Sequence, residues 1–367
     1  MKILVLSSHT PSLFHFRMDM MKAMKKDNNT VIAAAQMSAD EWKEEFNKNG
    51  IEYEQIFVKR NGINPLSDIH TFISIYKLVK KVKPDRIFVY QAKTVIYGSI
   101  AAAMLGIKGI YPLIAGIGSV FLGHGIKNSI IKSILKIQYR VALKKSKNVF
   151  FQNEDDKKLF VDSGMVDASK VRLIHGSGVN LEHFKVCELP EQKTILFIGR
   201  LVRDKGIYEY LETCKELKRR HPDIRCMLVG PFDTNPSAIE PKMLQEYIDN
   251  NIVEYFGEQK DVRKYIAQCT VYVLTSYREG TPKSVLEAMA MGRPIITTNA
   301  VGCKETVRNG YNGFLVNVKD IEDTVNKTEN LLYGDVLDEF GKNSRRMCEE
   351  LFDVNKVNDN ILTTMEI

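Results

Sequence analysis

The chain has 367 residues, of which 44% are hydrophobic and 26% are charged, and it carries a formal net charge of +7. This composition excludes a disordered chain, and this length exceeds what one hydrophobic core usually holds, so two globular domains are expected. The six cysteines are scattered without a CxxC pair, which argues against a zinc site and against a disulfide framework. We therefore expect reduced thiols and a cytoplasmic protein.

The sequence predicts neither a leader peptide nor a membrane span. The apolar run 3–6 meets polar Ser7 after four residues, far short of the apolar region of a signal peptide. No stretch reaches the roughly 18 uninterrupted apolar residues that a membrane-spanning helix requires. Any association with a membrane is therefore expected to be peripheral.

In the first half of the chain, short β-branched runs alternate with longer amphipathic stretches. This alternation is typical of a parallel sheet covered by helices, so residues 1–184 predict a doubly wound, Rossmann-like α/β domain. The predicted strands are 3–7, 30–35, 86–90, 109–113 and 148–151, and helices are expected to begin near Phe14, Ala39, Leu66, Thr94 and Lys127.

The same alternation restarts at residue 194, after a polar stretch at 185–192 that contains Pro190 and predicts a linker. Residues 193–350 predict a second Rossmann-like domain, and residues 351–367 predict a final helix that packs back toward the first domain. Ligands of parallel sheets bind beyond the carboxyl ends of the strands, so two facing sheets predict a central cleft. The predicted strands of this half are 194–198, 225–229, 253–256, 271–274 and 294–297.

A helix with recognisable ends follows the predicted strand 271–274. Thr281 is expected as its N-cap, Pro282 suits its first position, and Gly292 followed by Pro294 ends it, which predicts a helix over 282–291. The unpaired N–H groups and the positive dipole of its amino end suit a phosphate. This turn therefore indicates an anion-binding site in the second domain.

Two carboxylates and two cations accompany this turn. Glu279 precedes the helix and Glu287 lies on it, so the pair suits two hydroxyl-rich parts of one ligand, a sugar and a ribose. Arg200 and Lys205 follow the strand 194–198, where fixed cations would stabilise a diphosphate leaving group. Spacing alone also fits solvated acids at a helix start and an exposed basic loop, and both alternatives stay open at this point.

Residues 278–296 read REGTPKSVLEAMAMGRPII, and this run resembles the Glu-x7-Glu signature of family-4 glycosyltransferases. The resemblance implies the two-domain GT-B fold and a retaining enzyme that uses a nucleotide sugar. It implies that Glu279 contacts the donor sugar, that Glu287 holds the ribose, and that Arg200 and Lys205 stabilise the leaving diphosphate. Further donor contacts are expected at Gly199, Gly280, Thr281, Pro282, Ser284, Val285 and Pro231.

Two segments of the first half resemble a subgroup of this family that extends polyprenyl-diphosphate-linked glycans, including N-acetylgalactosaminyl transferases. They are 14–20, FHFRMDM, and 115–119, AGIGS. The family's usual Gly-Gly loop is replaced by SSHTPS at 7–12, and a histidine common in the family is missing after 109–113, so no catalytic base is assigned. The leaving phosphate can itself accept the proton of the incoming hydroxyl. Acceptor contacts are expected at His9, His15, Arg17, Gly116, Gly118 and Ser119. Contact with donor phosphates and packing at the domain edge are the alternatives for the first three.

A basic stretch covers 86–153, which contains ten Lys or Arg residues and no Asp or Glu. This asymmetry predicts an anion-rich neighbour. Cations recur along its amphipathic segment 125–147, which favours a helix that lies on an anionic bilayer surface. An ordinary surface helix with a solvated lysine face is the alternative. The cations of this segment that we assign to the membrane are Lys127, Lys132, Lys136, Arg140 and Lys144.

These features together predict a retaining transferase that moves a sugar from a UDP-sugar to an undecaprenyl-diphosphate-linked saccharide at the inner face of the cell membrane. An N-acetylhexosamine is expected, and the subgroup favours N-acetylgalactosamine and an α1,3 linkage. The absence of an Asp-x-Asp pair predicts that no metal cofactor is used. Alternatives are a transferase with a water-soluble acceptor and a UDP-sugar epimerase of the same fold. A nucleic-acid-binding module would leave Glu279 and Glu287 unexplained, so nucleic acid is not expected as a partner.

Overall fold

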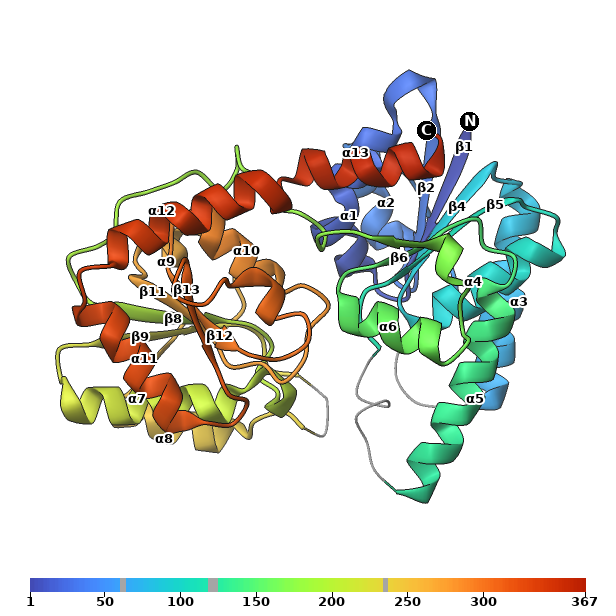
Figure 1. Cartoon of the computed structure of the whole chain (residues 1–367). Coiled ribbons are helices and arrows are strands. Elements are labelled where there is room, and N and C mark those ends of the chain that lie inside the picture. The colour runs from blue at the N-terminus through green and yellow to red at the C-terminus, as the bar shows by residue number, and fades with distance from the viewer. Residues whose placement is uncertain (60–63, 118–124, 234–236) are drawn as a thin grey trace. The chain divides into compact units, whose positions relative to one another are not determined.

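The computed structural model describes residues 1–59, 64–117, 125–233 and 237–367, which form two compact units (Figure 1). Unit 1 comprises Met1–Ser177 and Val357–Ile367, and unit 2 comprises Gly178–Lys356. The division lies earlier than the predicted domain end at 184. It does so because Val179 already belongs to unit 2, where its N–H donates to Phe352 O at 2.7 Å and its carbonyl accepts from Val354 N at 3.0 Å.

Unit 1 is built on a seven-stranded sheet with the strand order β3-β2-β1-β4-β5-β6-β7, and every neighbouring pair is parallel. Alternate residues of a strand face opposite sides of the sheet, so Ile3 and Val5 enter one buried cluster while Leu4 and Leu6 enter another. Both faces are apolar because helices cover both. The strands are β1 (Lys2–Leu6), β2 (Thr30–Ala35), β3 (Glu52–Gln55), β4 (Arg86–Tyr90), β5 (Gly109–Ile114), β6 (Val149–Phe151) and β7 (Val171–Leu173).

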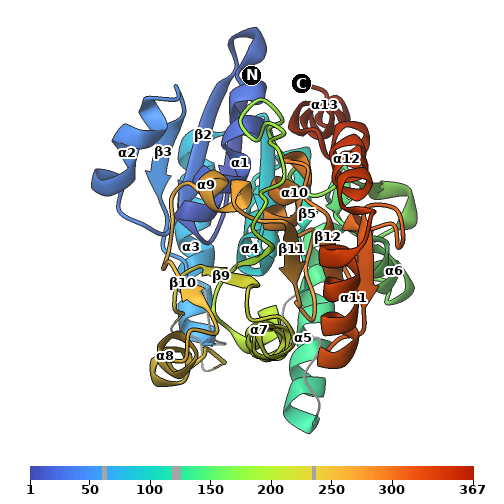
Figure 2. The same cartoon turned by 90° about the vertical axis from the view of Figure 1, so that its left-hand side faces the viewer.

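Helices α1, α2 and α13 cover one face of this sheet, and α3 to α6 cover the other. The last helix adds Val357, Ile361 and Leu362 to the cluster that contains β1 and α1, and its end lies beside the N-terminus in Figures 1 and 2. Within the described residues, no helix has the length and apolar character needed to cross a bilayer. The helices are α1 (Thr10–Met24), α2 (Ala39–Asn47), α3 (Pro65–Val82), α4 (Ala92–Met104), α5 (Ile126–Leu143), α6 (Glu154–Asp162) and α13 (Val354–Met365).

Unit 2 is built on a six-stranded parallel sheet with the order β10-β9-β8-β11-β12-β13. Its helices enclose one hydrophobic core, and α7 packs against α11 (Figure 2), where Arg220 and Glu329 form an ion pair at 2.9 Å. The strands are β8 (Thr194–Ile198), β9 (Arg225–Val229), β10 (Glu254–Tyr255), β11 (Val271–Leu274), β12 (Ile295–Thr298) and β13 (Gly313–Val316). The helices are α7 (Ile207–Arg220), α8 (Pro241–Asp249), α9 (Arg263–Ala267), α10 (Lys283–Ala290), α11 (Ile321–Tyr333) and α12 (Leu337–Met347).

Three strands, β3, β7 and β13, lie outside the predicted set, and all three are edge strands of their sheets. An edge strand buries only part of its surface, so it lacks the continuous apolar run that identifies a central strand. β3 reads EYEQ, and only its tyrosine is buried. The central strands, which the sequence predicts, carry the loops of the candidate site.

The predicted linker is bound tightly to unit 2 by Arg293, whose side chain is fully buried. Its guanidinium donates to the carbonyl oxygens of Cys187 at 3.0 Å, Glu188 at 3.0 Å and Ile266 at 2.9 Å. Buried carbonyl groups of an irregular segment need donors, and one guanidinium with five N–H groups supplies several. Arg293, which lies within the signature-like run 278–296, therefore holds the segment that leads into β8.

Candidate active site

The loops that follow β8 and β11 meet at the carboxyl edge of the sheet of unit 2. The N–H of Tyr277 donates to Asp204 O at 2.9 Å, which joins these two loops. The N–H of Glu279 donates to Val301 O, also at 2.9 Å, which adds the loop after β12. The predicted donor residues after β8 and β11 therefore lie at one edge of one sheet, the edge where parallel sheets bind ligands.

Two glycines allow these loops to approach one another. Gly302 has φ +82°, and a Cβ there would lie 2.2 Å from Glu279 O. Gly206, directly after Lys205, has φ +74°, and a Cβ there would lie 2.0 Å from Thr275 O. Only glycine adopts such angles without strain and leaves this space. The backbone positions of Glu279 and Lys205 therefore depend on the absence of a side chain opposite them.

Lys205 and Glu279 form an ion pair between Nζ and Oε1. Their side chains are only 23% and 12% exposed, so solvent screens this pair less than a surface pair. The predicted phosphate-binding cation and the predicted sugar-binding carboxylate are thus in direct contact. The alternative that Glu279 is merely a solvated acid at a helix start does not fit this burial and pairing.

Glu287 lies on α10 and is half-buried. Burial raises the pKa of its carboxyl to about 7, with Asp261 adding to the shift and Lys283 opposing it. Near neutral pH this group therefore exchanges between a carboxylate, which only accepts hydrogen bonds, and a carboxylic acid, which also donates one. Either form suits a diol such as a ribose, and the balance between them depends on pH.

The amino end of α10 differs by one residue from the prediction. The helix begins at Lys283, Pro282 takes the N-cap position with an extended ψ of 109°, and no side chain caps this end. The expectation that Thr281 caps the helix is therefore wrong. The first two helical hydrogen bonds, from Val285 N at 3.1 Å and from Leu286 N at 3.2 Å, are accepted by Pro282 O. The N–H of Val285, a residue that was expected to contact the donor, is therefore engaged within the helix.

Arg200 lies at the same edge and pairs with Asp233 at 2.7 Å. Its side chain is 43% exposed, whereas that of Asp233 is 18% exposed. Gly199 and Gly230 lie in contact behind it, since a Cβ on Gly230 would lie 1.8 Å from Gly199 O. Pro231 adjoins this contact and accepts the N–H of Leu201 at 3.1 Å.

In unit 1 the candidate residues are divided among different surfaces. His9 directly precedes α1, and Gly116 follows β5 with φ +127°. His15 and Arg17 both lie on α1, but His15 is exposed and Arg17 is 3% exposed, so they point to different sides of the helix. The structure therefore does not bring these two together. Gly118 and Ser119 lie outside the described residues.

The exposed face of α5 is apolar rather than basic along its centre. Four side chains that recur along this helix are more than half exposed, and we call them the α5 ridge: Ile130, Ile134, Ile137 and Val141. Lys132 and Lys136 are partly buried beside the ridge, while Lys144 is exposed at its end. Arg140 is exposed and donates to Ser163 O at 3.1 Å and Gly164 O at 2.9 Å. The side chain of Lys127 lies outside the described part of the structure.

Comparison with known proteins identifies the catalytic class of this pair of units. Residues 2–153 match the family model described as glycosyl transferase 4-like, and residues 192–333 match the model described as glycosyl transferases group 1. The first match covers most of unit 1, and the second covers the sheet edge that holds Lys205 and Glu279. The chain is a glycosyltransferase of the GT-B fold.

Two curated relatives of this glycosyltransferase act on undecaprenol-linked substrates according to their names. It is 28% identical to the N,N'-diacetylbacillosaminyl-diphospho-undecaprenol alpha-1,3-N-acetylgalactosaminyltransferase of Campylobacter jejuni, over 90% of this chain and 89% of the relative. It is 27% identical to the UDP-Gal:alpha-D-GlcNAc-diphosphoundecaprenol alpha-1,3-galactosyltransferase of Escherichia coli, over 82% and 80%. The crystal structure of Anabaena HepE with UDP and glucose has a TM-score of 0.80 at 19% identity and covers 100% of this chain and 99% of that one. That likeness shows the shared fold.

Two residues of the glycosyltransferase that sequence reasoning did not select are Asp233, which pairs with Arg200, and Gly302, which abuts Glu279. Asp233 follows β9 at the carboxyl edge, and this position is the only signal that the sequence offered for it. Gly302 lies in the loop after β12, and its role depends on a contact with Glu279 that spacing does not reveal.

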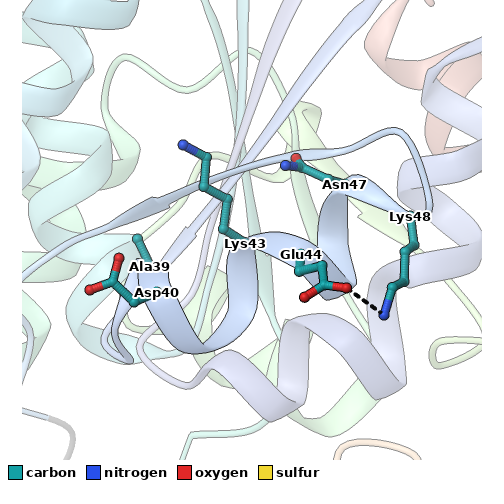
Figure 3. Close-up of a pocket in the computed structure, with 6 residues that line it drawn as sticks. All are labelled: Ala39, Asp40, Lys43, Glu44, Asn47 and Lys48. Carbon is teal, nitrogen blue, oxygen red and sulfur yellow. Dashed lines mark ion pairs between the residues drawn. The ribbon is translucent and has the colours of Figure 1, made fainter.

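Two surface depressions of the glycosyltransferase lie away from these residues. Figure 3 shows a shallow pocket along the exposed side of α2, where Glu44 and Lys48 form an ion pair at 3.1 Å. None of the predicted site residues lines this pocket. Across the described ranges, no group of three or more His, Cys, Asp or Glu side chains could hold a metal ion. Whether the reaction needs a metal therefore stays a prediction of the sequence.

Proposed function

We propose that this glycosyltransferase moves a sugar from a UDP-sugar, with retention of the anomeric configuration, to a saccharide linked to undecaprenyl diphosphate. The observation that carries this proposal is the partly buried Lys205–Glu279 pair at the carboxyl edge of unit 2. The names of the Campylobacter jejuni and Escherichia coli relatives support the acceptor class, because both contain an undecaprenol diphosphate acceptor and an α-1,3 transfer. We favour N-acetylgalactosamine as the sugar.

The donor lies along the loops after β8 and β11. Its diphosphate faces the amino end of α10, which no side chain caps, together with Lys205 and Arg200. Hydroxyl groups of the sugar donate to Glu279, and the ribose diol bonds to Glu287. A carboxylate accepts hydrogen bonds from hydroxyl groups, and a cation attracts phosphate. Glu279 and Lys205 lie in contact, so together they match a sugar and the diphosphate bonded to it.

The reaction breaks the bond between the anomeric carbon and the β-phosphate oxygen. The acceptor hydroxyl oxygen bonds to that carbon on the face from which UDP departs, and its proton passes to the departing phosphate oxygen. Negative charge grows on the diphosphate as the bond breaks, and Lys205 and Arg200 stabilise this charge. We assign this role to these cations and propose that the enzyme works without a metal ion.

The acceptor reaches the enzyme on the inner face of the cell membrane. The α5 ridge inserts its isoleucines among the acyl chains while the neighbouring lysines contact anionic headgroups. This placement is favoured by the stretch 86–153, which has ten cations and no acid to repel the membrane. The proposed contacts of unit 1 with the acceptor are His9, His15, Arg17 and Gly116, together with Gly118 and Ser119, which lie outside the described residues.

A donor screen tests the proposal. The purified chain is incubated with UDP-N-acetylgalactosamine, UDP-N-acetylglucosamine, UDP-galactose or UDP-glucose and a polyprenyl-diphosphate-linked saccharide, and the product linkage is read by NMR. We expect one donor to give an α-linked product and Glu279→Gln to give none, while Glu246→Gln, an exposed change on α8, keeps wild-type activity. Transfer by Glu279→Gln at the wild-type rate would overturn the proposal. So would isomerisation of the UDP-sugar without an acceptor, which would indicate an epimerase.

A further inference from the structure

Arg17 is a buried cation that has no negatively charged partner among the residues that the structure describes. It lies on the core-facing side of α1 and is 3% exposed. Within the described ranges, its buried Nε has no hydrogen-bond partner, and no carboxylate contributes to its electrostatic surroundings. The guanidinium carbon lies 5.1 Å from the centre of the Tyr90 ring. This aromatic face attracts the cation but supplies no acceptor for its buried Nε–H.

Such a position is unfavourable unless an anion joins it. A guanidinium stays protonated in proteins, and burial of an unpaired charge opposes folding. Burial lowers the pKa of Arg17, and Tyr90 alone opposes this shift. An arginine that is buried with unfilled donor positions therefore indicates that a negatively charged, acceptor-rich group completes the site when it binds.

The guanidinium lies near the carboxyl edge of the sheet of unit 1. Side chains on a helix lean toward its amino end, so Arg17 leans toward the start of α1. Tyr90, which it contacts, is the last residue of β4, and its hydroxyl donates to Ser12 Oγ in the first turn of α1 at 3.1 Å. Helices α1 and α4 both begin at this edge, and no side chain caps either start. Both helix dipoles therefore favour an anion on the side toward which Arg17 leans.

Gln91 holds the loop between β1 and α1 at this edge. It has φ 72°, which is rare for a residue with a side chain. Its Oε1 accepts hydrogen bonds from Ser7 Oγ at 2.8 Å, Ser8 N at 2.9 Å and Ser8 Oγ at 2.6 Å. The loop is thus fixed by neutral groups only. None of these groups supplies the negative charge that Arg17 lacks.

We propose that Arg17 is the central cation of a phosphate-binding site at the carboxyl edge of β1 and β4, and that its ligand is the diphosphate of the acceptor. The identity of the acceptor rests on the proposed function. The planar guanidinium matches two phosphate oxygens at once, which a lysine cannot do. The donor diphosphate has its own cations in unit 2, so the cation of unit 1 is left for the acceptor.

The test removes the charge of Arg17 and keeps most of its volume. For Arg17→Met we expect the KM for a polyprenyl-diphosphate-linked acceptor to rise at least tenfold, with an unchanged KM for the UDP-sugar. We also expect an unfolding temperature no lower than that of the wild type, because an unpaired buried charge is gone. A structural role predicts the reverse, namely a lower unfolding temperature and an unchanged acceptor KM, and that result would overturn the proposal. Arg172→Met, an exposed change on β7, is the matched control and should alter neither quantity.

Two further arms identify the anion. An acceptor with the same saccharide but an alkyl group in place of the diphosphate should react equally well with the wild type and Arg17→Met. A rise in the KM for the UDP-sugar would instead assign Arg17 to the donor and overturn the proposal. Calorimetric titration with inorganic pyrophosphate, in the presence of saturating UDP, separates this inference from the proposed function. Binding that Arg17→Met abolishes supports the site even where no lipid acceptor reacts, and equal binding by both proteins contradicts it.

Discussion

The cations at the carboxyl edges of the two sheets differ in their partners. In unit 2, Lys205 pairs with Glu279 and Arg200 pairs with Asp233, so each cation already has a carboxylate beside it. In unit 1, Arg17 is more deeply buried and has no such partner among the described residues. A cation with a carboxylate beside it suits a phosphate group next to sugar hydroxyls, whereas a buried cation without a carboxylate suits the phosphate groups alone. The difference therefore indicates which part of each substrate the two units bind.

The largest effect that tests this comparison is expected at Lys205. Lys205→Met should lower the transfer rate by on the order of 10²–10³-fold, the usual cost of removing one group that stabilises a growing charge. It should also lower the unfolding temperature, because Glu279 is left partly buried without its partner. Enzyme assays and thermal denaturation measure the two effects. An unfolding temperature that does not fall, as we expect for Arg17→Met, would remove the contrast between the units.

A smaller loss is expected from Gly302→Ala. The added Cβ would lie 2.2 Å from Glu279 O, so the loop that carries Glu279 has to move. Gly310→Ala is the matched control, since Gly310 also has a positive φ, +76°, but no atom lies within 4 Å of its added Cβ. Both changes should destabilise the protein by about 1 kcal/mol or more. Only Gly302→Ala should also reduce transfer, by an expected tenfold or more, and equal activities would show that this contact does not position Glu279.

The pH dependence of Glu287 gives a test that is specific to unit 2. Its pKa is raised to about 7 in the folded protein, from an ordinary value of 4.5. Its contribution to stability is therefore complete below about pH 4.5 and is lost as the pH rises through 7. The difference in unfolding free energy between the wild type and Glu287→Gln should fall over this range, as followed by urea denaturation at several pH values. A difference that does not change between pH 4.5 and 8 would contradict the assigned burial.

The α5 ridge should show the smallest single-site effect. Ile134→Ser removes one half-exposed apolar side chain, which should weaken binding to anionic vesicles by about 1.4 kcal/mol or less, that is, up to tenfold. Val186→Ser, an equally exposed change in unit 2, should have no effect. Co-sedimentation with vesicles of phosphatidylglycerol and phosphatidylcholine measures both variants. Equal binding of Ile134→Ser and the wild type would exclude the ridge as the membrane contact.

The two edges were also predictable to different degrees. Lys205, Glu279 and Glu287 were selected through the family resemblance, and the N-cap expected beside them at Thr281 is wrong. The central strands follow from the sequence, because buried parallel strands leave a local pattern. The edge strands β3, β7 and β13 do not, since partial burial removes that pattern. The ion pair between Arg200 and Asp233 joins residues that lie far apart in the chain. The lack of a carboxylate beside Arg17 among the described residues likewise depends on distant parts of the chain. The spacing of residues in the sequence carries no information on either feature. The α5 helix was predicted by its period, but which of its faces is exposed depends on its packing against α4.

Calorimetric titration of UDP into the wild type, Lys205→Met and Arg17→Met tests the assignment of the donor to unit 2 most directly. We predict one UDP per chain, bound at least tenfold more weakly by Lys205→Met and with unchanged affinity by Arg17→Met. UDP binding that survives Lys205→Met intact, or that Arg17→Met abolishes, would contradict the account.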